Sequence, residues 1–331
     1  IIDSNGLNFQ GDPDTYTVDY DTAGQSLNIV YSDATKGWLP VSDDAVADAP
    51  VALQQGIFAY GRNASSTKVS LSNIVSTSGV IASDTTGVGT PRFEGAGCSF
   101  GGNQGIFGYG TADSGAISLS NKVSSSGVVA SDVTGVGTAR RGLGACGYGN
   151  DKGIFGYGEG TSVTNLVSNS GVISANTTGV GTARHDIAAS TYGTDKGIFY
   201  GGWSSYNISN LISNTGVASA DQTGVGTGRG GLAGTTYGST GQAAFAYGAG
   251  LTNVKNLVSN TGVISSDATG VGTARSHLAA TKYGSDKGIF AYGDAGGAVS
   301  MSNLISNTGV IATDVTGVGT ARRSPSALAF G

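Results

Sequence analysis

The sequence predicts an all-β protein built from a tandem repeat, and two observations carry this prediction. First, the 331 residues include 58 glycines, and each interior glycine destabilises a helix by about 1 kcal/mol relative to alanine. Second, an Asn is followed nineteen positions later by an Arg six times along the chain. The six pairs are Asn73 and Arg92, Asn121 and Arg140, Asn165 and Arg184, Asn210 and Arg229, Asn256 and Arg275, and Asn303 and Arg322. Their recurrence at roughly 46 residues is typical of solenoids, propellers and other arrays.

Each repeat has the pattern of four short strands, most clearly in the sixth. Residues 276–284 form a small-residue strand, and residues 285–288 contain the Asp and Gly of a tight hairpin. Residues 288–293 alternate with the period of a strand, and residues 303–306 and 310–313 flank a second hairpin signal. Four antiparallel strands in this length match one blade of a β-propeller. Six second strands are marked by Phe58, Phe107, Phe155, Phe199, Phe245 and Phe290. The predicted fold is therefore a six-bladed propeller of four-stranded blades.

The two ends of the repeat region predict how this ring closes. The first repeat has a second strand at residues 56–61 but no room for a first strand before it. Residues 324–331 (SPSALAFG) match a first strand and follow the last repeat. We expect this C-terminal strand to complete the first blade, which would leave no exposed seam of unpaired strand edges.

The order of these features resembles kelch-type propeller repeats over residues 43–331. A strand ends in aromatic-Gly or Gly-Gly, a strand of the type Asn-Leu-Val-Ser follows, and an Arg closes the repeat. The Trp that usually follows the third strand in that family is absent, and the double glycine occurs only at Gly201-Gly202. Propellers include both enzymes and pure binding platforms, so the resemblance concerns architecture.

Residues 1–42 do not share the repeat and are expected to form a small N-terminal β module. Strand-like segments occur at residues 7–9, 16–20 and 26–31, and the chain is expected to turn over residues 32–38. Residues 29–38 (IVYSDATKGW) resemble a small β module of bacteriophage tail and fibre proteins. The resemblance implies a trimeric virion appendage that attaches to other virion proteins through residues 1–42.

The recurring polar residues are interpreted as construction rather than chemistry. Each repeated Arg is expected to tie one blade to the next by donating to backbone carbonyls, and each repeated Asn to fix strand register. The Asp that precedes each Thr-Gly-Val-Gly run is expected to cap a turn, because Ca²⁺ needs several oxygen ligands from one loop and one of the six positions is Asn176. Cys98 and Cys146 occupy equivalent small positions and are expected to be free, packed thiols.

Several function classes find no support in the sequence. The net charge of −5 without a basic cluster argues against nucleic-acid binding, and no apolar run is long enough for membrane insertion. No motif for a cofactor, a metal or a catalytic constellation is present, so an enzyme is not expected. The acids outside the repeat come from different blades, and the two histidines, His185 and His277, suit no ligand pair. These acids are Glu94, Asp113, Glu159, Asp186 and Asp294.

Function is expected in the loop of variable length between the second strand and the repeated Asn. The longest such loops, residues 62–72 and 111–120, are polar and rich in serine. The fourth repeat instead carries three aromatic residues, which stack well on sugar rings and on protein partners. The predicted ligand-binding residues are Tyr200, Trp203, Tyr206, Arg62, Asn63, Lys68 and Asp113.

These observations predict a binding head of a phage tail fibre or spike, exposed on the virion surface, which recognises a host-surface glycan or protein. One alternative is a structural decoration or fibril subunit whose loops pack against neighbouring copies. A second alternative is a surface-polysaccharide depolymerase that uses the loop carboxylates Glu94, Asp113 or Glu159, since glycoside hydrolysis needs a pair of carboxyl groups.

Overall fold

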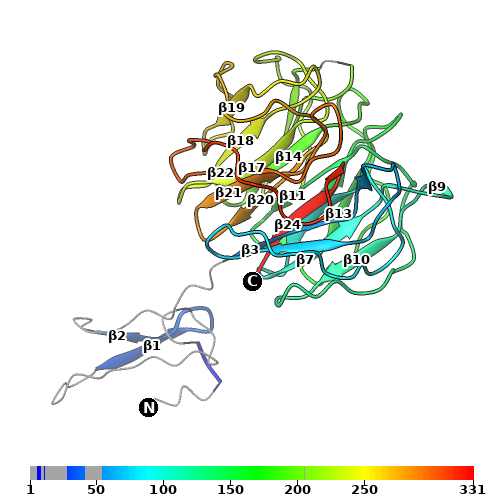
Figure 1. The fold of residues 1–331 in the computed structure, drawn as a ribbon. Helices are drawn as coiled ribbons and strands as arrows, with labels where there is room; N and C mark the ends of the chain where they lie inside the picture. Colours follow the sequence, from blue (N-terminus) through cyan, green and yellow to red (C-terminus); the bar gives the residue numbers. More distant parts are fainter. Residues whose placement is uncertain (1–5, 9–10, 12–27, 42–53, 205) are drawn as a thin grey trace. The chain divides into compact units, whose positions relative to one another are not determined.

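The chain divides into two compact units, residues 1–52 and residues 53–331. A computed structural model describes residues 6–8, 11, 28–41, 54–204 and 206–331 (Figure 1). All regular secondary structure in these residues is β, and none of them forms a helix that would reach across a bilayer. The predicted boundary between residues 42 and 43 lies outside the described residues.

The first unit contains one hairpin, formed by β1 (Ile29–Asp33) and β2 (Gly37–Pro40). The Asp33 side chain shapes its turn, because Oδ1 accepts hydrogen bonds from the amides of Thr35 at 2.8 Å and Lys36 at 2.7 Å. Across the two strands, the rings of Tyr31 and Trp38 meet edge to face at 5.5 Å. The turn is thus shorter than predicted, and Trp38 already belongs to a strand. The predicted strand at residues 16–20 lies outside the described residues.

The second unit contains six three-stranded antiparallel sheets, one for each repeat. The middle strand of each is the Gly-Ile-Phe-type strand, flanked by the first and third strands of the repeat. In the order first, second and third strand, the sheets are β24 (Ser326–Phe330), β3 (Gln55–Ala59) and β5 (Ser72–Val75); β6 (Ala96–Phe100), β7 (Gln104–Gly108) and β10 (Ser120–Val123); β11 (Gly144–Tyr148), β12 (Lys152–Gly156) and β13 (Thr164–Val167); β14 (Ala188–Tyr192), β15 (Lys196–Tyr200) and β16 (Ser209–Ile212); β17 (Ala233–Tyr237), β18 (Gln242–Ala246) and β19 (Lys255–Val258); and β20 (Ala279–Tyr283), β21 (Lys287–Ala291) and β22 (Ser302–Ile305).

The C-terminal strand joins the sheet of the first repeat, as predicted. β24 pairs with β3 in antiparallel register, with Leu328 opposite Ile57, and Figure 1 shows the red β24 beside the blue β3. Each first strand also lies against the first strands of two neighbouring sheets, in the order β6, β11, β14, β17, β20 and β24, and β24 in turn lies against β6. Two short ribbons complete the strands: β4 (Arg62–Asn63) pairs with β23 (Arg322–Arg323), and β8 (Thr111–Ala112) pairs with β9 (Gly115–Ala116).

The predicted fourth strand is not a regular strand in any repeat. In the first repeat, only isolated bridges join Val75 to Ile81 and Ser72 to Thr85. Between these two bridges, the segment predicted as the fourth strand has one residue more than β5. A continuous ladder of hydrogen bonds between the two is therefore impossible. The Asn73 side chain fills the interruption by donating to the carbonyl of Ala82 at 3.0 Å. The same pair of bridges recurs in the other five repeats.

Packing between sheets relies on aromatic pairs. The Phe of each second strand meets a Tyr of the preceding repeat, as in Phe155 and Tyr109 at 5.2 Å, and Phe58 meets Tyr292 at 5.4 Å across the chain ends. Such edge-to-face pairs add to the stabilisation from area burial. Cys98 is buried in this core as a free thiol, as predicted, and so is Cys146, whose pKa burial raises to about 12.

Candidate functional site

The six repeated arginines are buried and connect neighbouring repeats. Arg140 donates from Nε to the carbonyl of Tyr157 at 2.7 Å and from Nη1 to that of Thr138 at 3.1 Å, so the predicted donation to backbone carbonyls is confirmed. Nη2 donates to Oδ1 of Asn165 at 2.7 Å. Each Arg therefore meets the Asn of the following repeat, and Arg322 meets Asn73 of the first. The remaining pairs are Arg92 with Asn121, Arg184 with Asn210, Arg229 with Asn256, and Arg275 with Asn303.

The repeated Asp completes this contact, and its oxygens accept hydrogen bonds from neighbouring protein groups. Asp221 accepts hydrogen bonds from the amide and hydroxyl of Thr182 and from Asn210, and it lies 3.8 Å from Nη1 of Arg184. Burial opposes ionisation of Asp221, but the hydrogen bonds from Thr182 and Asn210 outweigh it and hold the pKa of this carboxyl below its usual range. The capping role is confirmed, although the capped turn belongs to the preceding repeat. Asn176 accepts from the Thr138 amide and donates to its hydroxyl.

The residue two positions after each Arg belongs to a ring that we call the axial ring. Its members all have φ between +49° and +63°. They are Glu94, Gly142, Asp186, Gly231, His277 and Ser324. Backbone hydrogen bonds join five of the six successive pairs, such as His277 N to Gly231 O at 2.7 Å and Ser324 N to His277 O at 2.6 Å. Four members are not glycine, and a left-handed backbone at such residues stores strain of the kind often found at functional sites.

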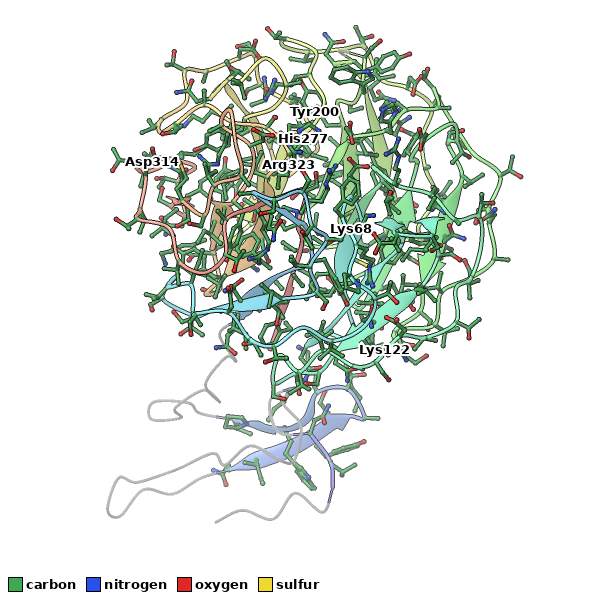
Figure 2. All side chains as sticks on the ribbon, turned by 45° about the vertical axis from the view of Figure 1, so that its right-hand side comes forward. Lys68, Lys122, Tyr200, His277, Asp314 and Arg323 are labelled. Carbon is green, nitrogen blue, oxygen red and sulfur yellow. The ribbon has the colours of Figure 1, made fainter. Side chains whose placement is uncertain are left out.

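The variable loops begin beside the axial ring. The residue before a member of the axial ring forms an isolated β-bridge with the first part of the variable loop of the same repeat. Examples are the bridges between Phe93 and Thr111 and between His185 and Trp203. In the first repeat, Arg323 pairs with Arg62 in the same way. The axial ring and the variable loops therefore share one end of the second unit, which we call the loop face. Figure 2 places His277 and Arg323 near the middle of this unit, and Lys122 and Asp314 toward its edge.

Charged side chains from different repeats converge on the axial ring. Arg141 contacts Glu94 at 3.5 Å and Glu159 at 2.6 Å. His185 and His277 each place Nε2 at 3.9 Å from the same oxygen of Asp186, a distance that suits an ion pair and is too long for a hydrogen bond.

The sequence-based prediction treats the two histidines only as a ligand pair and does not foresee that they share Asp186 as a partner. Sequence reasoning missed the cluster because it compared the histidines with each other. The signal was available in the common offset from Arg, since Glu94, Asp186 and His277 each stand two residues after one.

The surroundings change the protonation of two ring members. Burial is the main cause of the raised pKa of Glu94; Asp186 adds to the rise and Arg141 opposes it. Asp186 is also the main cause of the raised pKa of His277, which partial burial opposes. The two ring members thus hold their protons to higher pH than usual, and hydrogen-bond donors are available next to Asp186.

Tyr200 is not available to a ligand, in contrast to the prediction. Its side chain is fully buried, its ring lies 5.0 Å from that of Phe245, and its hydroxyl donates to the carbonyl of Val225 at 2.7 Å. In the other repeats a Tyr side chain fills the same place in the core. That Tyr stands one residue later in the repeat than Tyr200 and has positive φ, as at Tyr157. In the fourth repeat Gly201 takes that backbone position, so Tyr200 is a core residue that has moved by one place.

The other two aromatic residues of the fourth repeat reach the surface. Trp203 is 51% exposed, and its amide donates to the carbonyl of His185 at 2.8 Å. Tyr206 is half-buried, and its amide donates to the carbonyl of Gly202. Trp203 therefore offers a flat apolar surface close to the axial ring.

The four predicted residues from the first two repeats lie together around Phe93. Lys68 forms an ion pair with the exposed Asp113 at 2.6 Å, and the Arg62 guanidinium lies 4.9 Å from the Phe93 ring centre. Asn63 uses its Oδ1 within its own loop, where it accepts from the Thr67 amide at 2.9 Å. The structure thus brings together Arg62, Asn63, Lys68 and Asp113 as one group, and Trp203 and Tyr206 as another.

Comparison with known proteins adds no assignment to these features. No protein-family model matches the chain, and no curated protein is similar enough to count as a relative. Within the described residues, no group of three or more His, Cys, Asp or Glu side chains is arranged to hold a metal ion. The loop face offers charges of both signs, hydrogen-bond donors and an exposed indole, which together suit recognition of a polar ligand.

Proposed function

We propose that residues 53–331 form a closed six-bladed β-propeller of the kelch-like type. Support comes from the cyclic order of the first strands, from the pairing of β24 with β3, and from the contact of Arg322 with Asn73. The contact of Arg322 with Asn73 joins the sixth repeat to the first. It has the same Arg–Asn hydrogen bond as the contacts between all other neighbouring repeats.

The propeller is a recognition head, and one observation carries this proposal. The buried Arg and Asn are the same in all six repeats, whereas the loop face gathers Glu94, Asp113, Glu159, Asp186 and Asp294 together with both histidines and the exposed Trp203. Four of the six members of the axial ring are non-glycine residues with positive φ, a backbone conformation that is often found at functional sites. A surface of this kind on a constant scaffold is typical of binding loops.

The partner is a glycan or protein on a host-cell surface, and the chain is a virion appendage. The aromatic face of Trp203 stacks on a sugar ring, while the ion pairs of the axial ring exchange partners with its hydroxyl and charged groups. The virion assignment rests on the resemblance of residues 29–38 to phage tail and fibre modules. Residues 1–42 would then attach the chain to other virion proteins as a trimer.

The test is a glycan array and a cell-binding assay with the purified full chain, together with its mass in solution. Trp203→Ala is expected to weaken binding at least about tenfold, because stacking on an exposed indole is lost. Lys122→Ala is the matched control, since Lys122 lies away from the loop face and donates only to the carbonyl of Ser170. Unchanged binding by the Trp203 variant, with a folded protein, would contradict the proposed surface.

A glycan-cleaving enzyme is the second candidate, because Glu94 holds its proton to raised pH beside Asp186. A carboxyl group with a raised pKa suits the general acid of glycoside hydrolysis, which works with a second carboxyl group. Shortening of host polysaccharide that Glu94→Gln abolishes would establish this activity. A structural subunit would instead show assembly without binding to any glycan or cell.

A further inference from the structure

A second site lies inside the ring of first strands, away from the loop face. A cavity of about 260 Å³, which we call the axial cavity, is lined by the second and fourth residues of these strands and reaches the hairpin turns at their far ends. The second positions are all Gly or Ala: Gly97, Ala145, Ala189, Gly234, Ala280 and Ala327. The fourth positions differ and are Ser99, Gly147, Thr191, Thr236, Lys282 and Ala329.

Lys282 brings a positive charge into this cavity. Lys152 also lines it but forms an ion pair with Asp151. Within the described part of the chain, the ammonium group of Lys282 donates no hydrogen bond and forms no ion pair. Burial lowers the pKa of its ammonium group, and the only charge that opposes this is Asp286. Asp286 itself is bound to Lys287 at 3.0 Å and to an Asn side chain at 2.9 Å.

Two hydroxyl groups of the cavity, those of Ser99 and Thr236, already donate their protons to backbone carbonyls. Ser99 donates its proton to the carbonyl of Ala329 at 2.7 Å, and Thr236 donates its own to the carbonyl of Thr191 at 2.9 Å. Thr236 Oγ1 also lies 3.2 Å from Ser190 Oγ, and each of the two oxygens keeps a lone pair that can accept a hydrogen bond from a guest. The cavity therefore complements a molecule with one negative charge and several hydroxyl groups.

We propose that the axial cavity binds a small hydroxylated carboxylate, such as a uronic-acid sugar, with the carboxylate on Lys282 and the hydroxyls donating to Ser99 and Thr236. An ion pair of this kind offsets the unfavourable burial of an ammonium group that has no partner. The volume is below the roughly 300–1,000 Å³ of sites for drug-sized ligands, so the guest is a single sugar rather than a chain. The proposal does not depend on the loop face.

The experiment is calorimetric titration of the full chain with glucuronate and galacturonate, with glucose and galactose as neutral controls of the same shape. We expect at least one uronate to bind about tenfold or more tightly than its neutral counterpart. Lys282→Met, which keeps the length of the side chain, is expected to remove this preference. Lys122→Met, outside the cavity, is expected to leave it unchanged.

A measurement on the unmodified protein covers the case in which the Lys282 variant does not fold. Saturating uronate is expected to raise the pKa of Lys282, followed by NMR of labelled lysine side chains, because a bound carboxylate favours the charged ammonium. Absence of uronate binding, equal binding of the neutral sugars, or an unchanged Lys282 signal would overturn the proposal. Any of these results leaves the glycan-array test of Trp203 unaffected, so the two proposals fail separately.

Discussion

Replacing Asn176 with Asp is expected to stabilise the second unit, and the repeat itself supplies the reason. Five of the six contacts between repeats place an Asp carboxylate 3.8–4.0 Å from the buried Arg. The contact of Arg140 is the exception, because its neighbour is Asn176. Asn176→Asp would give this contact the ion pair that the others have.

The expected gain is about 1 kcal/mol in the free energy of unfolding. Two unit charges 3.9 Å apart attract each other by about 4 kcal/mol at an effective dielectric constant of ~20. Burying the carboxylate offsets most of this attraction, and partial exposure weakens the rest. The equivalent Asp side chains are 27–32% exposed. We therefore take the net contribution of the ion pair from the upper end of the range for exposed ion pairs, about 1 kcal/mol. It corresponds to a rise of about 2 °C in the melting midpoint.

The pH dependence separates the ion pair from other effects of the substitution. The equivalent carboxyls have lowered pKa values in the folded state, as at Asp221. A lowered pKa stabilises the fold above the unfolded value of about 4, and this contribution is lost as pH falls below it. Asn176→Asp should therefore stabilise more at pH 7 than at pH 3.

The assay is urea denaturation at both pH values, with Asp221→Asn as the reciprocal variant. Asp221→Asn should destabilise by a similar amount at pH 7, because it converts a regular contact into the Asn176 type. No gain from Asn176→Asp at pH 7, or an equal gain at pH 3, would refute the reasoning. A gain that persists in an Arg140→Met background would also contradict it, because the Arg partner would then be irrelevant.

Three further predictions follow from the packing. Gly153→Ala should destabilise by about 1–3 kcal/mol in urea denaturation, since a Cβ there would stand 2.4 Å from the Cys98 sulfur, and Cys98→Ala in the same chain should restore most of the loss. Deleting residues 324–331 should leave β3 with an unpaired edge and cause aggregation, measured by light scattering; addition of the missing segment as a peptide should reduce it. Gly37→Ala should speed hydrogen exchange of the Trp38 amide and leave the melting midpoint of the second unit unchanged, because Gly37 has φ of +67° and a Cβ there would clash with the Asn8 carbonyl.

The sequence alone determined the elements that depend on short stretches of chain. Strand periodicity and turn residues located the first three strands of each repeat, and the constant interval between Asn and Arg counted the repeats. The fourth strand was predicted wrongly, because the one-residue excess of the outer segment and the inserted Asn73 side chain are visible only in three dimensions. Tyr200 was misplaced for a related reason, since a shift of one residue turns an apparent surface aromatic into a core residue.

The tertiary structure alone decided which residues meet across the repeats. The repeated Arg and the Asn nineteen residues before it belong to the same repeat, but the hydrogen bond goes to the Asn of the next one. Likewise, Glu94, Asp186 and His277 come from different repeats, lie far apart in sequence and come together only through the packing of those repeats. Local sequence specifies strands and turns through nearest-neighbour conformational preferences, whereas these contacts depend on how whole sheets pack, and the candidate sites are made of such contacts.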